Sequence, residues 1–208
     1  NTAVGALSLD AVTEGDYNTG VGFTSGSKIT TGTRNVALGA FANQEGTTGN
    51  DNTYVGYAAG ASTTTSSNNT AVGKSAMAAN TTGAENVAIG YEALTNNTTA
   101  GNNVAIGKDA LRANTTGNTN IAIGTDAMTT NVAGDRNVAV GEQALQNMNP
   151  SGNVDTYNVG IGYNAGLSIT TGTANAFIGS RAGDATTTGS TNTAIGTVVG
   201  DWETENDN

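Results

Sequence analysis

Apolar and polar positions recur along the chain with a period of 17 residues. Each repeat has Val, Leu or Ile directly before a glycine, asparagine four residues before it, and in most copies alanine three residues after it. The glycines are Gly5, Gly22, Gly39, Gly56, Gly73, Gly90, Gly107, Gly124, Gly141, Gly162, Gly179 and Gly196, with a single interval of 21 residues. Such a fixed period is typical of a repeat protein in which each unit packs only on its neighbours.

Each repeat predicts one short strand. Residues 86–90, NVAIG, are rich in β-branched residues and end in a glycine, which is typical of a strand closed by a turn. Side chains alternate across a strand, so Val87 and Ile89 should share one face and Asn86 and Ala88 the other. We expect the aliphatic face to point into the core and the Asn and Ala face to point outward.

The predicted fold is an all-β solenoid, or β-roll, of twelve 17-residue coils in residues 1–200. Stacked helices are the alternative, but a glycine in every repeat, with Asn and Thr clusters between, would end each helix after about two turns. A four-residue insertion falls near residues 146–157 and contains the only proline, Pro150. Residues 201–208 lose the repeat and are interpreted as a cap or the start of a further segment.

Two columns of stacked residues are predicted to hold the coils together. The expected core is the aliphatic column, represented by Val72, Ile89, Ile106, Ile123 and Val140. The asparagines should stack into a ladder of bonded side-chain amides: Asn35, Asn52, Asn69, Asn86, Asn103, Asn120 and Asn137. We interpret this ladder as structural rather than as a ligand site, because stacked amides stabilise turns and bond one another.

Composition narrows the functions that the chain can have. Seven basic and 17 acidic residues give a net charge of −10, which disfavours nucleic acid and anionic membranes as partners. The chain has no Cys and no His, and therefore lacks thiolates, disulfides and the commonest metal ligand and general base. No apolar stretch approaches the roughly 20 residues of a membrane span. We therefore expect no enzyme, no catalytic residues, no cofactor and no membrane insertion.

Acidic residues in three successive repeats are a weak candidate for a metal site. Glu92, Asp109 and Asp126 lie at the same offset, two residues after the glycine, where their carboxylates should repel unless a cation bridges them. Lys108 and Arg112 lie close enough in the pattern to compensate the charge. The calcium-binding GGxGxD repeat is absent, so we favour a solvated charged face.

Threonine forms a third column, which raises the possibility of ice binding. It consists of Thr13, Thr30, Thr47, Thr64, Thr81, Thr98, Thr115, Thr170 and Thr187, and a second Thr follows all but the first. Adjacent residues of a strand face opposite ways, so only one of each pair can face outward. Val132 and Pro150 interrupt the column, so we favour a polar strand that leads into a turn.

Aromatic residues recur directly after the glycine, at Phe23, Tyr57, Tyr91 and Tyr163. They could stack on sugar rings, or shield the edge of a turn or a subunit contact, and we favour the structural role. Two further aromatics depart from the pattern: Tyr54 and Phe177 stand where most repeats have Ala or Gly. They must either enlarge a contact or protrude.

The repeats resemble those of a known class of fibre proteins. NTAVGKSAMAANTTGAE, NVAIGYEALTNNTTAGN and NVAIGKDALRANTTGNT look like the repeats of bacterial and phage proteins called tail-fibre-domain-containing, along residues 1–199. The core NVAIG is also similar to the head repeats of trimeric autotransporter adhesins, which are left-handed β-rolls joined as trimers. The resemblance implies a homotrimeric fibre on a virion or cell surface, and no catalytic residue.

The expected function is therefore a structural and adhesive fibre segment. A thin solenoid buries little surface, which favours a parallel homotrimer, with the small residues Ala, Gly and Asn of the strand at the subunit contact. The surface or the insertion would contact a host-surface receptor or glycan. The alternative is an ice- or glycan-binding β-solenoid acting alone.

Overall fold

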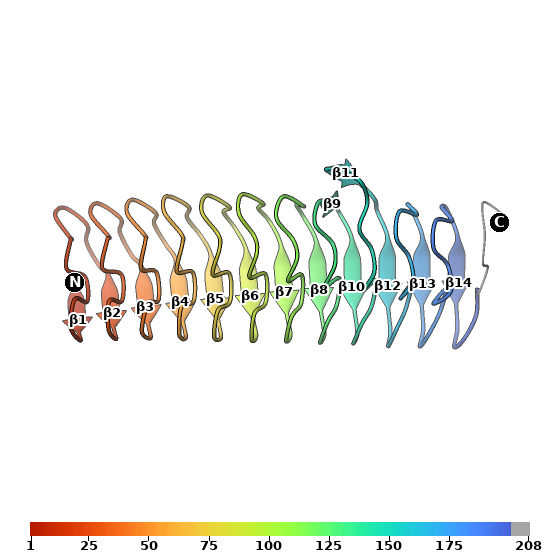
Figure 1. The fold of residues 1–208 in the computed structure, drawn as a ribbon, viewed down its shortest axis with the longest axis horizontal. Coiled ribbons are helices and arrows are strands. Elements are labelled where there is room, and N and C mark those ends of the chain that lie inside the picture. Colours follow the sequence, from red (N-terminus) through yellow and green to blue (C-terminus); the bar gives the residue numbers. More distant parts are fainter. Residues whose placement is uncertain (201–208) are drawn as a thin grey trace.

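The computed structural model describes residues 1–200, which form an all-β solenoid. Successive coils stack along the long axis of the molecule, with the chain entering at one end and leaving at the other (Figure 1). The fold class predicted from the 17-residue period is confirmed. Within residues 1–200 no helix has the length and apolarity of a membrane span. The interpretation of residues 201–208 as a cap lies outside the described residues.

One parallel sheet runs the length of the solenoid and takes one strand from each repeat. Its strands are β1 (Thr2–Val4), β2 (Thr19–Val21), β3 (Val36–Leu38), β4 (Thr53–Val55), β5 (Thr70–Val72), β6 (Val87–Ile89), β7 (Val104–Ile106), β8 (Ile121–Ile123), β10 (Val138–Val140), β12 (Val159–Ile161), β13 (Ala176–Ile178) and β14 (Thr193–Ile195). Residues one period apart pair directly, as Ala88 does with Ala105. Equivalent side chains therefore stack in columns along the rod.

The repeated glycine is required by both its backbone angle and its surroundings. Gly107 has φ of 131°, and a Cβ at this position would lie 2.5 Å from the carbonyl oxygen of Gly124 in the next coil. No other residue fits so close to a neighbouring backbone. The segment after the glycine forms turns, in which Asp109 and Leu111 have left-handed backbone angles.

The predicted orientation of the strands is wrong. The aliphatic residues proposed as the core, Val72, Ile89, Ile106, Ile123 and Val140, face outward and are half-buried or exposed; 38% of the surface of Ile89 is accessible. The alanine column, including Ala88, is fully buried instead. Ala93 and Leu94, three and four residues after the glycine, complete the interior. The physical reason is size: a coil of 17 residues leaves room for little more than Ala on the inner face of its strand.

The buried asparagines also correct the expected subunit contact. Asn and Ala from the inner side of the strand are enclosed within one chain, so they are not free to meet a neighbour. The residues available for contact are the aliphatic ones.

Tyr54 and Phe177 do not protrude, because both rings lie inside the core and are fully buried. Glycine replaces the usual Leu or Met nearby: a Cβ on Gly60 would lie 2.4 Å from the Tyr54 ring, and one on Gly183 would lie 2.4 Å from the Phe177 ring. A large side chain on the strand is thus compensated by a glycine six residues later. Burial raises the pKa of Tyr54 to about 12, although hydrogen bonds from neighbouring side chains oppose this shift.

The insertion leaves the solenoid at one corner and returns in register. It carries β11 (Val154–Asp155), which pairs with β9 (Gly134–Asp135) and projects beyond the outline of the coils (Figure 1). Arg136 forms an ion pair with Asp155, and the Tyr157 hydroxyl donates to the same carboxylate at 2.8 Å. These contacts hold the exposed loop against the preceding coil.

Candidate functional site

The outer side of the long sheet is the main apolar surface of the described chain. It consists of two columns, the residues three and one before each glycine, which we call the sheet face. The first column is Thr2, Thr19, Val36, Thr53, Thr70, Val87, Val104, Ile121, Val138, Val159, Ala176 and Thr193. The second is Val4, Val21, Leu38, Val55, Val72, Ile89, Ile106, Ile123, Val140, Ile161, Ile178 and Ile195.

The sheet face contains no charged residue, although the chain carries a net charge of −10. In the central coils its side chains are only partly covered, with 36% of Val72 and 39% of Ile161 accessible. Parallel register places each aliphatic side chain directly over the next, so the surface is continuous. A contiguous apolar surface of this kind usually marks a contact with another molecule.

Two polar and aromatic rims border the sheet face. The start rim, five residues before each glycine, is Tyr17, Arg34, Asp51, Asn68, Glu85, Asn102, Thr119, Arg136, Tyr157, Ala174 and Thr191. The end rim, directly after each glycine, is Ala6, Phe23, Ala40, Tyr57, Lys74, Tyr91, Lys108, Thr125, Glu142, Tyr163, Ser180 and Thr197. Every start-rim residue is exposed, and every end-rim residue is exposed or half-buried.

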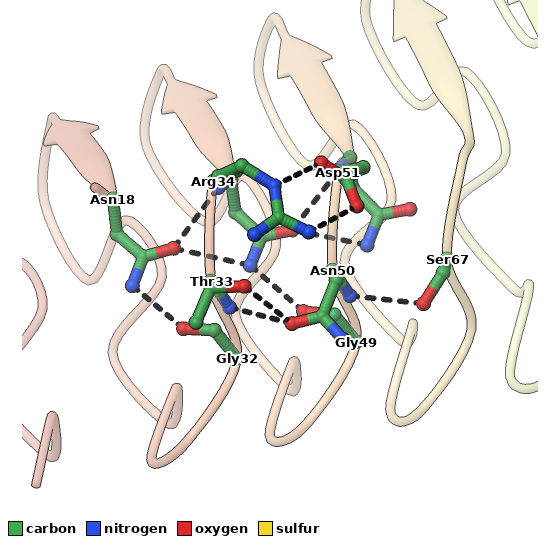
Figure 2. A network of polar contacts seen from close by, with 10 residues as sticks. Asn18, Gly32, Thr33, Arg34, Gly49, Asn50, Asp51 and Ser67 are labelled. Atoms are coloured by element: carbon green, nitrogen blue, oxygen red, sulfur yellow. Dashed lines mark hydrogen bonds and ion pairs between the residues drawn. The ribbon is translucent and has the colours of Figure 1, made fainter. Parts of the chain in front are cut away.

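The asparagine ladder lies directly behind the sheet face and holds each strand in place. In Figure 2 the Asn18 amide donates to the Gly32 carbonyl at 2.7 Å, and its oxygen accepts the backbone N–H of Asn35 at 3.0 Å. All of the predicted ladder residues are buried, and the same pattern recurs at each of them except Asn137, whose amide donates to the Asp135 carbonyl next to the insertion. Each ladder asparagine thus bonds the next coil through its side chain and the preceding asparagine through its backbone N–H, and it satisfies backbone groups inside the protein.

Side chains near the start rim add a second set of contacts between coils. Asn50 accepts both the backbone N–H and the hydroxyl of Thr33, at 2.7 and 2.9 Å (Figure 2). Arg34 binds Asp51 through two hydrogen bonds of 2.5 and 2.8 Å. The hydrogen bond from Arg34 holds the pKa of Asp51 below its usual value. Since both side chains are exposed, we assign this pair a role in alignment rather than in stability.

A second buried asparagine column was not predicted. Asn80, Asn97, Asn114 and Asn131 each donate to the carbonyl oxygen three residues later, at 2.9 to 3.0 Å. Asn97 also donates to the Asn80 side chain at 2.9 Å. The sequence signal was present, because three of the four precede the threonine pairs in the repeated motif NTT.

The acidic column is arranged as the sequence predicted, in consecutive coils. The backbone N–H groups of Glu92, Asp109 and Asp126 each donate to the preceding coil, which places the three residues in register. Arg112 lies 4.0 Å from the Glu92 carboxylate and 3.8 Å from that of Asp109, and Lys108 lies 3.6 Å from Asp109. Within residues 1–200 no group of three or more acidic side chains could hold a metal ion.

The threonine column uses its hydroxyl groups to connect coils. The hydroxyls of Thr13, Thr30, Thr47, Thr64, Thr81, Thr98, Thr115 and Thr170 each donate to a carbonyl oxygen of the next coil, at 2.9 to 3.3 Å. The second threonine of the pair is the more exposed one in most coils, as Thr82 and Thr99 show. A single exposed file therefore remains on this surface.

Changing Thr81, Thr98 and Thr115 together to Val should cost less than about 1 kcal/mol per site, because the carbonyls that lose a hydroxyl donor keep backbone N–H partners. Thermal unfolding of the triple variant measures this loss. We also expect no thermal hysteresis from the parent protein. Ice shaping by the parent that disappears in the triple variant would favour the ice-binding alternative.

The aromatic residues gather at the N-terminal end of the end rim. The rings of Phe23 and Phe41, and of Phe41 and Tyr57, pack edge to face with centroids 5.5 Å apart. Phe41 was not part of the predicted column because it lies one residue further from its glycine. Further along, Lys74 lies over the ring of Tyr91, with its nitrogen 5.5 Å from the centroid.

Comparisons with protein-family models, curated proteins and solved structures give no match to this chain. The likeness to fibre repeats therefore rests on the quoted motifs alone. The site itself is described by its geometry: a continuous aliphatic sheet face, two exposed rims and a rigid, hydrogen-bonded interior.

Proposed function

We propose that this chain is a structural and adhesive fibre segment, the shaft of a parallel homotrimer. The observation that carries the proposal is the sheet face, an uncharged surface that continues through every coil of a chain with a net charge of −10. Covering one partly exposed Val or Ile gains on the order of 1 kcal/mol, and the gain repeats in each coil. A second and a third copy of the chain are the partners whose surface matches it along its whole length.

Three copies fit the dimensions of the sheet face. The five residues from the ladder asparagine to the glycine span about 17 Å, at about 3.3 Å per residue. Three such faces close a triangular prism whose axis lies about 5 Å from each sheet, which is half the usual spacing of packed sheets. Four faces would leave an open channel, so the Val and Ile side chains would not fill the centre.

The proposed fibre acts by rigidity and multivalency. Twelve coils at about 4.8 Å each give a shaft of roughly 58 Å, which carries three copies of every outward surface. Three weak contacts on one rigid body raise avidity without any new contact. The partner would be a host-surface receptor or glycan, and the place of action a virion or cell surface. The exposed insertion at β11 is the most prominent of the outward surfaces (Figure 1).

Light scattering on the purified chain tests the assembly. We expect a particle of three times the 20.6 kDa chain mass at micromolar concentration. A folded particle with the mass of one chain would contradict the proposal. A particle of two chains would instead indicate a dimer in which two sheet faces pack against each other.

Charges placed on the sheet face should separate the chains without unfolding them. Ile89 and Ile106 lie outside the core of the solenoid, so changing both to Lys should give a monomer that keeps its β-sheet circular dichroism. The physical reason is that six ammonium groups would be buried around the axis of the trimer. Light scattering gives the mass of the variant.

The matched control changes Thr82 and Thr99 to Lys. Both threonines are exposed and lie outside the sheet face, and each precedes one of the two isoleucines by seven residues. It should keep the mass of the parent. If the variant with Lys in place of Ile89 and Ile106 remains trimeric, the sheet face is not the contact surface.

A further inference from the structure

The two rims of the sheet face form a matched pair, and this inference rests on the proposed function. In a ring of copies related by rotation, the same two different surfaces meet at every contact. The strands run across the solenoid axis, so the end of each strand in one copy faces the start of a strand in the next. The end rim of one protomer must therefore meet the start rim of its neighbour.

Closed symmetry also determines which coils meet. Rotation about the fibre axis includes no shift along it, so corresponding coils lie at the same height. Six residue steps, about a third of one coil, separate the start rim from the end rim. Between the two rims the chain therefore rises by roughly 2 Å along the solenoid axis, less than the strand spacing of about 4.8 Å. Rim residues of the same coil are therefore the nearest partners.

The aromatic residues of the two rims coincide under this pairing. Tyr17, with 78% of its surface accessible, falls opposite Phe23 of the next copy. Tyr157 falls opposite Tyr163, and both rings are about half exposed. Exposed aromatic rings at the border of an apolar face gain most when they pack on one another.

The charged and small residues match as well. Arg136 falls opposite Glu142, which is the sole pair of opposite charges, and no two like charges meet in the described coils. Arg136 uses one terminal nitrogen for Asp155 and Tyr157, which leaves the other donors of its guanidinium group for Glu142. Three further pairs bring small residues together: Thr119 with Thr125, Ala174 with Ser180, and Thr191 with Thr197.

A shift of one coil loses the aromatic pairs and the pair of Arg136 with Glu142, although it brings Asp51 opposite Lys74 and Glu85 opposite Lys108. It would place Thr119 opposite Glu142, Tyr157 opposite Ser180, and Arg136 opposite Tyr163. It would also leave an apolar strand uncovered at each end of the shaft. The aromatic residues of the rims thus agree with the arrangement that symmetry requires, whereas the charged residues do not distinguish the two registers.

We propose that the rims are a docking surface between copies of this chain, which fixes them in parallel and without stagger. Arg136 of one protomer binds Glu142 of the next, and the aromatic pairs close the seam near both ends. The sheet face supplies the affinity, and the rims supply the register.

Cross-linking tests the register, since the chain contains no cysteine. The double variant T119C/T125C replaces two small, exposed residues that the proposal places opposite each other. A mild oxidant or a short bis-maleimide should join three chains covalently in a closed ring. The two positions of one chain cannot react together, because they are separated by a nearly extended strand and a disulfide requires Cα atoms within about 7 Å.

Two controls represent a shift of one coil in either direction: T119C/E142C and T119C/K108C. Both should give much less than one tenth of the covalent trimer formed by T119C/T125C. Light scattering is recorded for each variant before cross-linking.

The outcomes separate the two proposals. Trimers that cross-link only in a control variant would overturn the register and leave the trimeric fibre intact. Particles with the mass of one chain would overturn both proposals. A covalent ring that closes at two chains would overturn the three-fold arrangement.

Discussion

Changing Tyr54 to Ala should lower the free energy of unfolding by about 3 to 5 kcal/mol, because a fully buried aromatic ring leaves a cavity in a narrow core. Adding Gly60→Leu in the same chain should recover most of the loss. The double variant has the residue pair of the central coils, such as Ala88 and Leu94. Chemical denaturation of the parent, both single variants and the double variant gives the coupling between the two sites.

Gly60→Leu alone should also destabilise the protein, because its Cβ would overlap the Tyr54 ring. Backbone strain is not the reason, since Leu94 adopts the same left-handed angle at the equivalent position, with φ of 52°. If the two single losses simply add in the double variant, the two positions do not share one volume in the core.

Removing one amide of the ladder is expected to cost about 1 to 3 kcal/mol. Asn103 donates to the Gly117 carbonyl at 2.9 Å and accepts the Asn120 backbone N–H at 2.9 Å. Asn103→Ala leaves the Asn120 backbone N–H buried without a partner, at about 1 to 3 kcal/mol, whereas the Gly117 carbonyl keeps the hydrogen bond from the Asn114 side chain. The melting temperature and the midpoint of denaturation measure the loss.

Asn96→Ala is the matched control, because this asparagine is exposed and lies in the adjacent coil. It should change stability by less than about 0.5 kcal/mol. Equal effects of the two substitutions would show that the buried ladder is not what holds the coils together.

The sequence was sufficient to predict the coils but not the direction in which their side chains point. The period located every strand of the long sheet, and alternation correctly separated Ile89 from Ala88. Alternation alone cannot say which set is inside. Apolar character favoured Ile89, whereas the deciding quantity is the space within a 17-residue coil, which only the folded chain reveals.

A clue to the interior was nevertheless present. Tyr54 and Phe177 occur in repeats that have Gly60 and Gly183 six residues later, where a larger side chain would overlap the ring. The proposed contact surface also depends on the true orientation of the strands, because the aliphatic column that faces outward forms part of the sheet face. The pattern also predicted correctly that Arg112 lies near the acidic column, where it pairs with Glu92 and Asp109.

The bonds between coils lie along the rod, which has a mechanical consequence for a fibre under tension. The backbone of each coil is hydrogen-bonded to its neighbours, and the coils stack along the long axis (Figure 1). A pull on the two ends of a single chain would load these bonds one coil at a time rather than all together. Such a chain yields by peeling from an end and lengthens in small steps while its remaining coils stay folded. The subunit contacts proposed above run across that direction and would oppose the peeling, so that a shaft of three chains resists a steady load better than one.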